Sequence, residues 1–180
     1  MTLEHTDRPV PVPATPAASR VRRPTWIIFV GLAAVILVVD QVVKQWVLAN
    51  FEFQTPVRIV GDYVRIVLIH NNGGLFGMFR EQATLFAIAS IAVMAGIVWF
   101  EARIGQASLL MSITLGLLLG GALGNLVDRV RFGYVVDFVD MGIGTWRGWT
   151  YNVADSAISL SIVLQLLMAL FPIAGRTERD

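Results

Sequence analysis

Four long apolar stretches dominate the pattern of the chain. They run approximately from Trp26 to Val47, from Ala83 to Phe100, from Ser108 to Val127 and from Val153 to Ile173. A helix that crosses a bilayer needs about 20 mostly apolar residues. The pattern therefore predicts an α-helical membrane protein whose four transmembrane helices form one domain over residues 25–173, with both ends of that domain on one side of the membrane.

The two longer connecting segments predict structure outside the membrane. Residues 57–69 read VRIVGDYVRIVLI, where apolar residues alternate with Arg58 and Arg65 around a Gly-Asp turn. This period-two pattern is typical of a β-hairpin with one apolar face, which suits the membrane surface. The second segment contains Trp146 and Trp149 among glycines, and tryptophan favours the membrane interface. We expect these two residues to be membrane anchors.

The terminal segments set the expected orientation. Residues 1–24 are rich in proline and alanine and end in a cluster of Arg20, Arg22 and Arg23, a composition that predicts a disordered tail. Positive charge beside the first helix usually keeps that side in the cytoplasm. We therefore expect cytoplasmic tails at 1–24 and 174–180, with the connecting segments on the outer face.

Composition excludes several kinds of site. The apolar fraction is 56 % and the mean hydropathy is +0.67, against about 45–50 % apolar residues in a soluble domain. Cysteine is absent, the histidines are His5 and His70, and Lys44 is the sole lysine. Cysteine nucleophiles, zinc sites and Ser-His-Asp triads lack the residues they need. The net charge of +1 gives no reason to expect nucleic-acid binding.

Polar and small residues inside the helices indicate how the helices meet. Gly116, Gly120 and Gly124 recur every fourth residue and predict a ridge where another helix approaches closely. Asp40 and Lys44 lie four apart in the first helix, so they share a face and can form an ion pair. That pair can be purely structural or part of a catalytic site.

The end of the third helix carries a second polar group. Asn125, Asp128 and Arg129 stand three and four residues apart. The last two of them can simply end the helix and orient the next segment, or they can belong to a site.

Two further aspartates suggest chemistry at the membrane boundary. In YVVDFVD, an extended backbone would place Val135, Asp137 and Val139 on one face, and a charge in so apolar a strand is costly without partners or a task. Asp155 follows Asn152 by three residues, which fits a capped helix start. If the two aspartates converge, one can act as general base toward water and the other as general acid.

These residues alone leave several functions open. An aspartyl hydrolase would use Asp137 and Asp155. A Ser-Lys protease would use Ser156 as nucleophile and Lys44 as base. Intramembrane carboxylates also mark ion paths in small transporters, although the chain shows no internal repeat, and a pure scaffold is the remaining alternative.

Five separated motifs resemble one known family. They are Asp40-x3-Lys44, Asn71-x-Gly73-x-x-Phe76, GGALGNLVDR at 120–129, YVVDF at 134–138 and YNVADSAI at 151–158. In this order, over residues 26–173, they are similar to the bacterial lipoprotein signal peptidases, also called signal peptidase II. The resemblance implies an aspartic protease of the bacterial cytoplasmic (inner) membrane. It would remove the signal peptide from prolipoproteins by cutting before a cysteine that carries diacylglycerol.

The resemblance also implies roles for individual residues. The catalytic pair would be Asp137 and Asp155, with the site toward the outer face and the loop around the tryptophans covering it. The residues implied to bind or support the substrate are Asn71, Gly73, Asn125, Asp128, Arg129 and Asn152, and Asp40 and Lys44 would be mainly structural. No metal or cofactor is implied, the partners would be lipid-modified prolipoproteins and membrane lipids, and we expect a monomer. The chain departs from the family pattern at Gly74, Leu75 and Tyr151, which bears on substrate fit.

Overall fold

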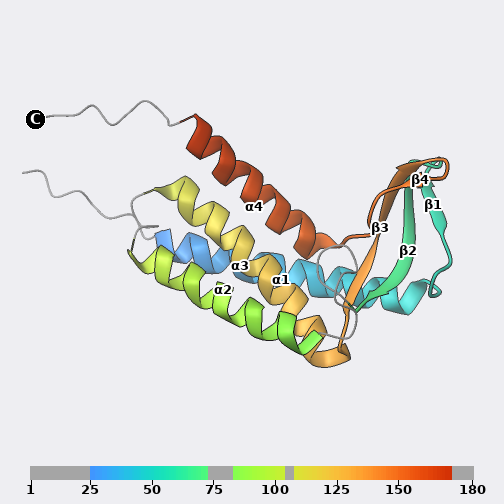
Figure 1. The fold of residues 1–180 in the computed structure, drawn as a ribbon, viewed down its shortest axis with the longest axis horizontal. Coiled ribbons are helices and arrows are strands. Elements are labelled where there is room, and N and C mark those ends of the chain that lie inside the picture. Colours follow the sequence, from blue (N-terminus) through green and yellow to red (C-terminus); the bar gives the residue numbers. More distant parts are fainter. Residues whose placement is uncertain (1–24, 73–82, 104–107, 172–180) are drawn as a thin grey trace, which may run out of the picture.

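A computed structural model describes residues 25–72, 83–103 and 108–171. The described chain contains the helices α1 (Thr25–Asn50), α2 (Ala83–Arg103), α3 (Leu109–Phe132) and α4 (Val153–Leu170), and the strands β1 (Val57–Val60), β2 (Val64–Asn71), β3 (Val135–Ile143) and β4 (Trp146–Arg147). Figure 1 shows the helices as an elongated bundle with the sheet at one end. This architecture confirms the predicted membrane-helix fold with a small sheet. The predicted tails at 1–24 and 174–180, and Ile173, lie outside the described residues.

The four helices differ in how deeply they are packed. Each is long and apolar enough to cross a membrane, and 56 % of the most apolar part of α3 is buried, against 17 % in each of the other three helices. The outward side chains of the other three are large and apolar, such as Val35, Ile88 and Leu166, each more than half exposed. Apolar side chains on the outside suit contact with lipid, so α3 is the central helix of the bundle.

Glycines bring the neighbouring helices close to α3. A Cβ atom added to Gly120 would lie 2.8 Å from the carbonyl oxygen of Ala33 in α1, and Gly116 meets α1 one turn earlier. On the other side, a Cβ atom on Gly121 would lie 2.5 Å from the carbonyl oxygen of Ala154 in α4. The predicted close approach along the ridge is confirmed, and Gly121 extends it to a second helix that the four-residue spacing did not indicate.

The third helix ends later than its hydropathy predicts. The alternative in which Asp128 and Arg129 end the helix is wrong, because α3 continues to Phe132. The helix ends at Gly133, whose φ of 77° lies in the left-handed region that favours glycine, and whose N–H binds the carbonyl oxygen of Arg129. The extra turn keeps the polar residues of α3 on a rigid helix beneath the sheet.

The sheet has the antiparallel order β1-β2-β3-β4. The predicted hairpin is confirmed as β1 and β2, with Gly61 at a φ of 52° in the turn between them. Strand β3 then pairs with β2 so that Ile69 lies opposite Asp137 and Asn71 opposite Val135, with an irregularity between Ile66 and Ile69. This pairing joins the two connecting segments into one sheet.

A small apolar cluster holds the sheet against the bundle. It consists of the buried residues Val47, Leu68, Val136 and Phe138. The two tryptophans expected to be membrane anchors lie at the sheet end and are exposed, Trp146 at 88 % and Trp149 at 70 %. Their insertion into the interface stays a prediction.

Candidate active site

Asp137 is a buried carboxylate held by two amides. Its neighbours Val136 and Phe138 point into the apolar cluster, so the alternation of β3 directs Asp137 to the other face, as predicted. The side chain of Asp137 is almost fully buried. Its Oδ1 accepts a 2.7 Å hydrogen bond from Nδ2 of Asn152, and its Oδ2 accepts a 2.9 Å hydrogen bond from Nδ2 of Asn71.

Asp155 occupies the third position of α4. Its backbone N–H donates to Oδ1 of Asn152 at 2.9 Å, and its Oδ2 accepts from the backbone N–H of Asn152 at 3.2 Å, which completes a capping box. The predicted helix cap is therefore confirmed. The other carboxylate oxygen, Oδ1, accepts a 2.7 Å hydrogen bond from Nδ2 of Asn125 in α3. Asp155 is thus fixed by its own helix and by α3 at once.

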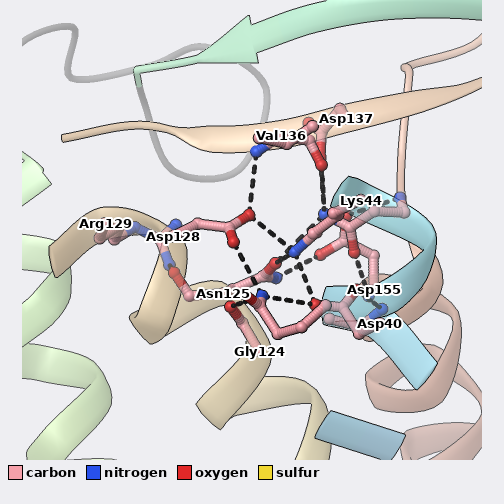
Figure 2. Close-up of polar contacts among 12 residues, drawn as sticks. Asp40, Lys44, Gly124, Asn125, Asp128, Arg129, Val136, Asp137 and Asp155 are labelled. Atoms are coloured by element: carbon pink, nitrogen blue, oxygen red, sulfur yellow. Dashed lines mark hydrogen bonds and ion pairs between the residues drawn. The ribbon is translucent and has the colours of Figure 1, made fainter. Parts of the chain in front are cut away.

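Asn152 connects the two aspartates. Its side-chain amide binds Asp137 and its backbone N–H binds Asp155, and Figure 2 shows the two carboxylates on facing sides of the same polar cluster. Burial, followed by the negative charge of Asp155, raises the pKa of Asp137 to about 7, against the opposing effect of the Asn71 and Asn152 amides. Two carboxylates coupled in this way can share one proton.

Lys44 is the centre of the buried network. Its side chain is fully buried, and Nζ lies 2.8 Å from Oδ2 of Asp40 and 2.8 Å from Oδ2 of Asp128. Nζ also donates to Oδ1 of Asn125 at 3.0 Å. The predicted pair with Asp40 is confirmed, and the same ammonium group also binds α3 (Figure 2).

Asp40 reaches the start of another helix. Its Oδ1 accepts a 2.9 Å hydrogen bond from the backbone N–H of Ala154, the second residue of α4. The first N–H groups of a helix have no partner within it and attract negative charge. A carboxylate from α1 therefore caps the helix that carries Asp155.

Asp128 links the bundle to the sheet. Its Oδ2 accepts the backbone N–H of Val136 at 3.0 Å, and its Oδ1 accepts Nε2 of Gln41 at 2.9 Å. Nε2 of Gln41 also lies 3.2 Å from the carbonyl oxygen of Gly124. Sequence reasoning missed Gln41, although an amide in the middle of an apolar helix was a signal of the same kind as Asp40.

The remaining residues implied by the family differ in their placement. Arg129 is half-buried, donates from Nη1 to the carbonyl oxygen of Asn125 at 3.3 Å and lies with its guanidinium 5.7 Å from the centre of the Phe86 ring. Figure 2 shows it at the edge of the polar cluster. Asn71 is the last residue of β2, and Gly73 lies outside the described residues.

The donor set is suited to acid–base chemistry. Within the described residues, no group of three or more His, Cys, Asp or Glu side chains could hold a metal ion. The arrangement offers instead two coupled carboxylates, each held by amides, beside buried cationic charge. Such a pair can take a proton from water and give one to a leaving group.

Comparison with known proteins decides among the open functions. The family profile described as Signal peptidase (SPase) II matches residues 32–171. The chain belongs to the signal peptidase II family. It is 34 % identical over 152 residues to the lipoprotein signal peptidase of Moorella thermoacetica, covering 84 % of this chain and 98 % of that one. It is 37 % identical over 145 residues to that of Desulfitobacterium hafniense, covering 81 % and 93 %.

Solved structures agree with this assignment. A bacterial membrane enzyme determined by the in meso method at 2.3 Å resolution matches with a TM-score of 0.77 at 28 % identity, over 85 % of this chain and 93 % of that one. A second, at 1.9 Å resolution, matches with a TM-score of 0.73 at 29 % identity, over 79 % and 92 %. As a signal peptidase II family member, the chain is an aspartic peptidase and a multi-pass protein of the inner membrane.

Membership of the signal peptidase II family removes the transporter and scaffold alternatives. The Ser-Lys alternative also lacks its geometry. The hydroxyl of Ser156 donates to the carbonyl oxygen of Asn152 at 2.9 Å, while the ammonium group of Lys44 binds carboxylates and the Asn125 amide. The hydroxyl and the ammonium group are thus each bound to other partners instead of to one another.

Proposed function

We propose that this protein removes signal peptides from prolipoproteins, cutting before a diacylglyceryl-modified cysteine, with Asp137 and Asp155 as its catalytic pair. The observation that carries the assignment of the pair is the bridge through Asn152, which binds both carboxylates. Burial and the charge of Asp155 raise the pKa of Asp137 to about 7. The substrate class comes from the relatives, which are named lipoprotein signal peptidases.

The two aspartates would divide the acid–base work. Asp137 is the more deeply buried of the two, and its raised pKa favours the protonated form at rest. Asp155, ionised, would take a proton from a water held between the carboxylates. That water attacks the scissile carbonyl carbon while Asp137 protonates the carbonyl oxygen, which gives a tetrahedral diol. As the C–N bond breaks, the proton taken up by Asp155 passes to the leaving amine and one diol hydroxyl returns a proton to Asp137, which leaves the carboxylic acid product and the starting state of the pair.

Neighbouring residues would hold this geometry and receive the substrate. The amide of Asn125 is already used, because it donates to Asp155 and its oxygen accepts from Lys44. We therefore assign Asn125 to positioning the pair rather than to binding the substrate. Arg129 is half-buried at the edge of the cluster, and its guanidinium suits the peptide carbonyls of a substrate backbone.

The orientation of the protein follows from charge and shape. We propose that the start of α1 and the end of α4 face the cytoplasm, since Arg20, Arg22 and Arg23 precede α1. The sheet lies at the opposite end of the bundle (Figure 1), so the site would face outward with Trp146 and Trp149 at the lipid interface. Two acyl chains on the substrate would hold its scissile bond at this depth. We also propose that the protein acts as a monomer.

The experiment compares Asp137→Asn and Asp155→Asn with the parent in detergent, using a diacylglyceryl-modified prolipoprotein. Each variant keeps the size of the side chain but cannot ionise, so we expect cleavage to fall by about 1,000-fold or more. Asp62→Asn, in the exposed β1–β2 turn, is the matched control and should cleave at the parent rate. Parent-like cleavage by either site variant would refute the pair, and equal cleavage of unmodified precursor would refute the lipid requirement.

A further inference from the structure

An ion-pair network on the sheet lies outside the site described above. Its centre is Asp140 of β3, which is 5 % exposed. Nε and Nη2 of Arg65 lie 2.8 and 2.6 Å from Oδ2 of Asp140. Nη2 of Arg147 lies 2.9 Å from the same oxygen, and Nε of Arg147 lies 3.2 Å from both carboxylate oxygens.

Arg147 makes further contacts that only a guanidinium can combine. Its Nη1 donates to the carbonyl oxygen of Asp62 at 2.6 Å, and its Nη2 lies 3.2 Å from the carbonyl oxygen of Asp140. One side chain on β4 thus holds the β1–β2 turn and β3 together. The planar fork of the guanidinium supplies donors in several directions, which a lysine ammonium on a flexible stem does not reproduce.

The ion-pair network holds the segment of chain that runs from Asp137 to Asp155, the two proposed catalytic residues. After Asp137 the chain continues along β3, turns into β4 at Trp146–Arg147 and returns at Tyr151. There the backbone of Tyr151 pairs with Val139, with N–H to oxygen distances of 3.0 and 2.8 Å, just before Asn152 begins α4. Arg147 therefore fastens the middle of the loop whose two ends carry Asp137 and Asp155.

The network also fixes the register of β3 beyond an irregularity. Arg65 lies opposite Asp140 and Ile69 lies opposite Asp137, but the regular register is interrupted between Ile66 and Ile69. An irregularity in a strand pair bends the strand and re-aims its side chains, so the ion pair of Arg65 with Asp140 holds the two strands together beyond it. At its other end β3 is held by the bond from the N–H of Val136 to Asp128, so the strand is fixed on both sides of Asp137.

The central carboxylate keeps its charge over the working pH range. Burial alone would raise the pKa of Asp140, but the hydrogen bonds of Arg147 and Arg65 and their charges outweigh that effect and hold the pKa below its usual range. Asp140 therefore remains an anion while Asp137 gains or loses its proton. The ion-pair network around Asp140 therefore persists through the catalytic cycle, and Asp140 does not compete for the proton of Asp137.

We propose that Arg147 is a positioning residue for the hydrolysis. By binding Asp140 and the Asp62 carbonyl, it fixes the path from Asp137 to Asp155 and so the separation of their carboxylates. This inference rests on the proposed function of the pair.

The test measures kcat, KM and the pH profile of kcat for Arg147→Gln on the same modified prolipoprotein. A misplacement of about 1 Å costs about 100-fold in rate, so we expect kcat to fall by about 10- to 100-fold while KM changes by less than about threefold. The matched control is Arg58→Gln, which loses an exposed ion pair to the same Asp62 and should keep both constants. Arg147→Lys should recover only part of the loss.

The pH profile separates positioning from general stability. Within the part of the chain that the structure describes, the charged groups that interact with Asp137 are Asp155 of α4, Lys44 of α1 and Arg129 of α3. If the carboxylates move apart in Arg147→Gln, the charge of Asp155 raises the pKa of Asp137 less. The falling limb of the pH profile, which is the decline of kcat at high pH, then moves to lower pH. Asp140→Asn should shift the limb in the same direction, and the double variant should lose no more than the worse single variant.

The outcomes are distinguishable. If the parent does not cleave the prolipoprotein, the proposed function itself is wrong. If the parent cleaves and Arg147→Gln keeps its kcat, or loses kcat without any shift of the falling limb, the positioning role is refuted. A lower melting temperature with unchanged kcat and pH profile would likewise reduce Arg147 to a structural residue and overturn the inference.

Discussion

Nδ2 of Asn152 lies 2.7 Å from Oδ1 of Asp137, and this contact ties the start of α4 to the strand that faces it. Because the amide stabilises the charged carboxylate, it lowers the pKa of Asp137 against the stronger effects of burial and Asp155. In Asn152→Ser the hydroxyl can still cap α4, but the bond to Asp137 is lost. We expect the cleavage rate to fall by about 100-fold. In a plot of rate against pH, the falling limb should move to higher pH. A limb at the parent position would mean that the amide does not act on this carboxylate.

The parent should lose activity as the pH rises through neutrality. The proposed acid step needs the proton on Asp137, whose pKa is about 7. The rate of prolipoprotein cleavage should therefore decline about tenfold per pH unit above that value, measured over a pH range where the detergent-solubilised enzyme stays folded. Constant activity to pH 9 would contradict the assignment of Asp137 as the acid.

Stability should depend on the same proton and should also decline as the pH rises. Folding raises the pKa of Asp137 from 3.8 to about 7, so the folded protein binds the proton more tightly than the unfolded chain does. The resulting stabilisation is complete below pH 3.8 and is lost as the pH rises through 7. We expect the melting temperature of Asp137→Asn to fall less than that of the parent between about pH 5 and 8. Parallel curves for the two proteins would show that the proton is not bound at Asp137.

Lys44 should be needed for folding rather than as a base. Lys44→Met would leave Asp40 and Asp128 buried without their cation, which costs about 3–5 kcal/mol of unfolding free energy when one partner of a buried pair is removed. Thermal unfolding in detergent measures this loss. Ser156→Ala, which removes only a hydroxyl bound to the Asn152 carbonyl, should cleave at the parent rate. Loss of cleavage in Ser156→Ala with normal folding would revive the serine mechanism.

The contact between α3 and α4 should not tolerate an added methyl group. A Cβ atom on Gly121 would lie 2.5 Å from a backbone oxygen of Ala154, so Gly121→Ala must push α4 away. We expect a loss of about 1–3 kcal/mol in stability, together with reduced cleavage, because α4 carries Asp155. Gly31→Ala in α1 meets no atom within 4 Å and is the matched control. Equal melting temperatures for the two variants would contradict this packing.

Hydropathy and the cost of buried charge were enough to predict much of this molecule. The four helices follow from apolar length, and Asp137 stood out because a charge in an apolar strand needs partners. The capping box at Asn152 and Asp155 is a local pattern with a fixed spacing, so it could be read directly from the sequence. The same reasoning made the two aspartates a candidate acid–base pair, and the resemblance to signal peptidase II implied their catalytic role, which stays a prediction.

Other features depend on contacts between distant segments and carry no local signal. The bond from the N–H of Ala154 to Asp40 joins residues 114 apart, and only the packing of α1 against α4 creates it. The sequence left open whether Asp128 ends the third helix or belongs to a site, because its partners Lys44 and Val136 lie on other elements. The pairing of Arg65 with Asp140 requires a register that passes through an irregularity, which hydrophobic alternation does not specify.

The ion pair between Asp40 and Lys44 also bears on the order in which the protein is assembled. The two residues are one helical turn apart in α1. Their other partners lie on α3 and α4, which leave the ribosome after α1. A single charge in the bilayer is costly, but a neutralised pair on one helix costs much less. Helix α1 can therefore enter the membrane with its charges already matched. When α3 and α4 are inserted later, they exchange lipid contacts for bonds to Asp40 and Lys44, which are already in the membrane.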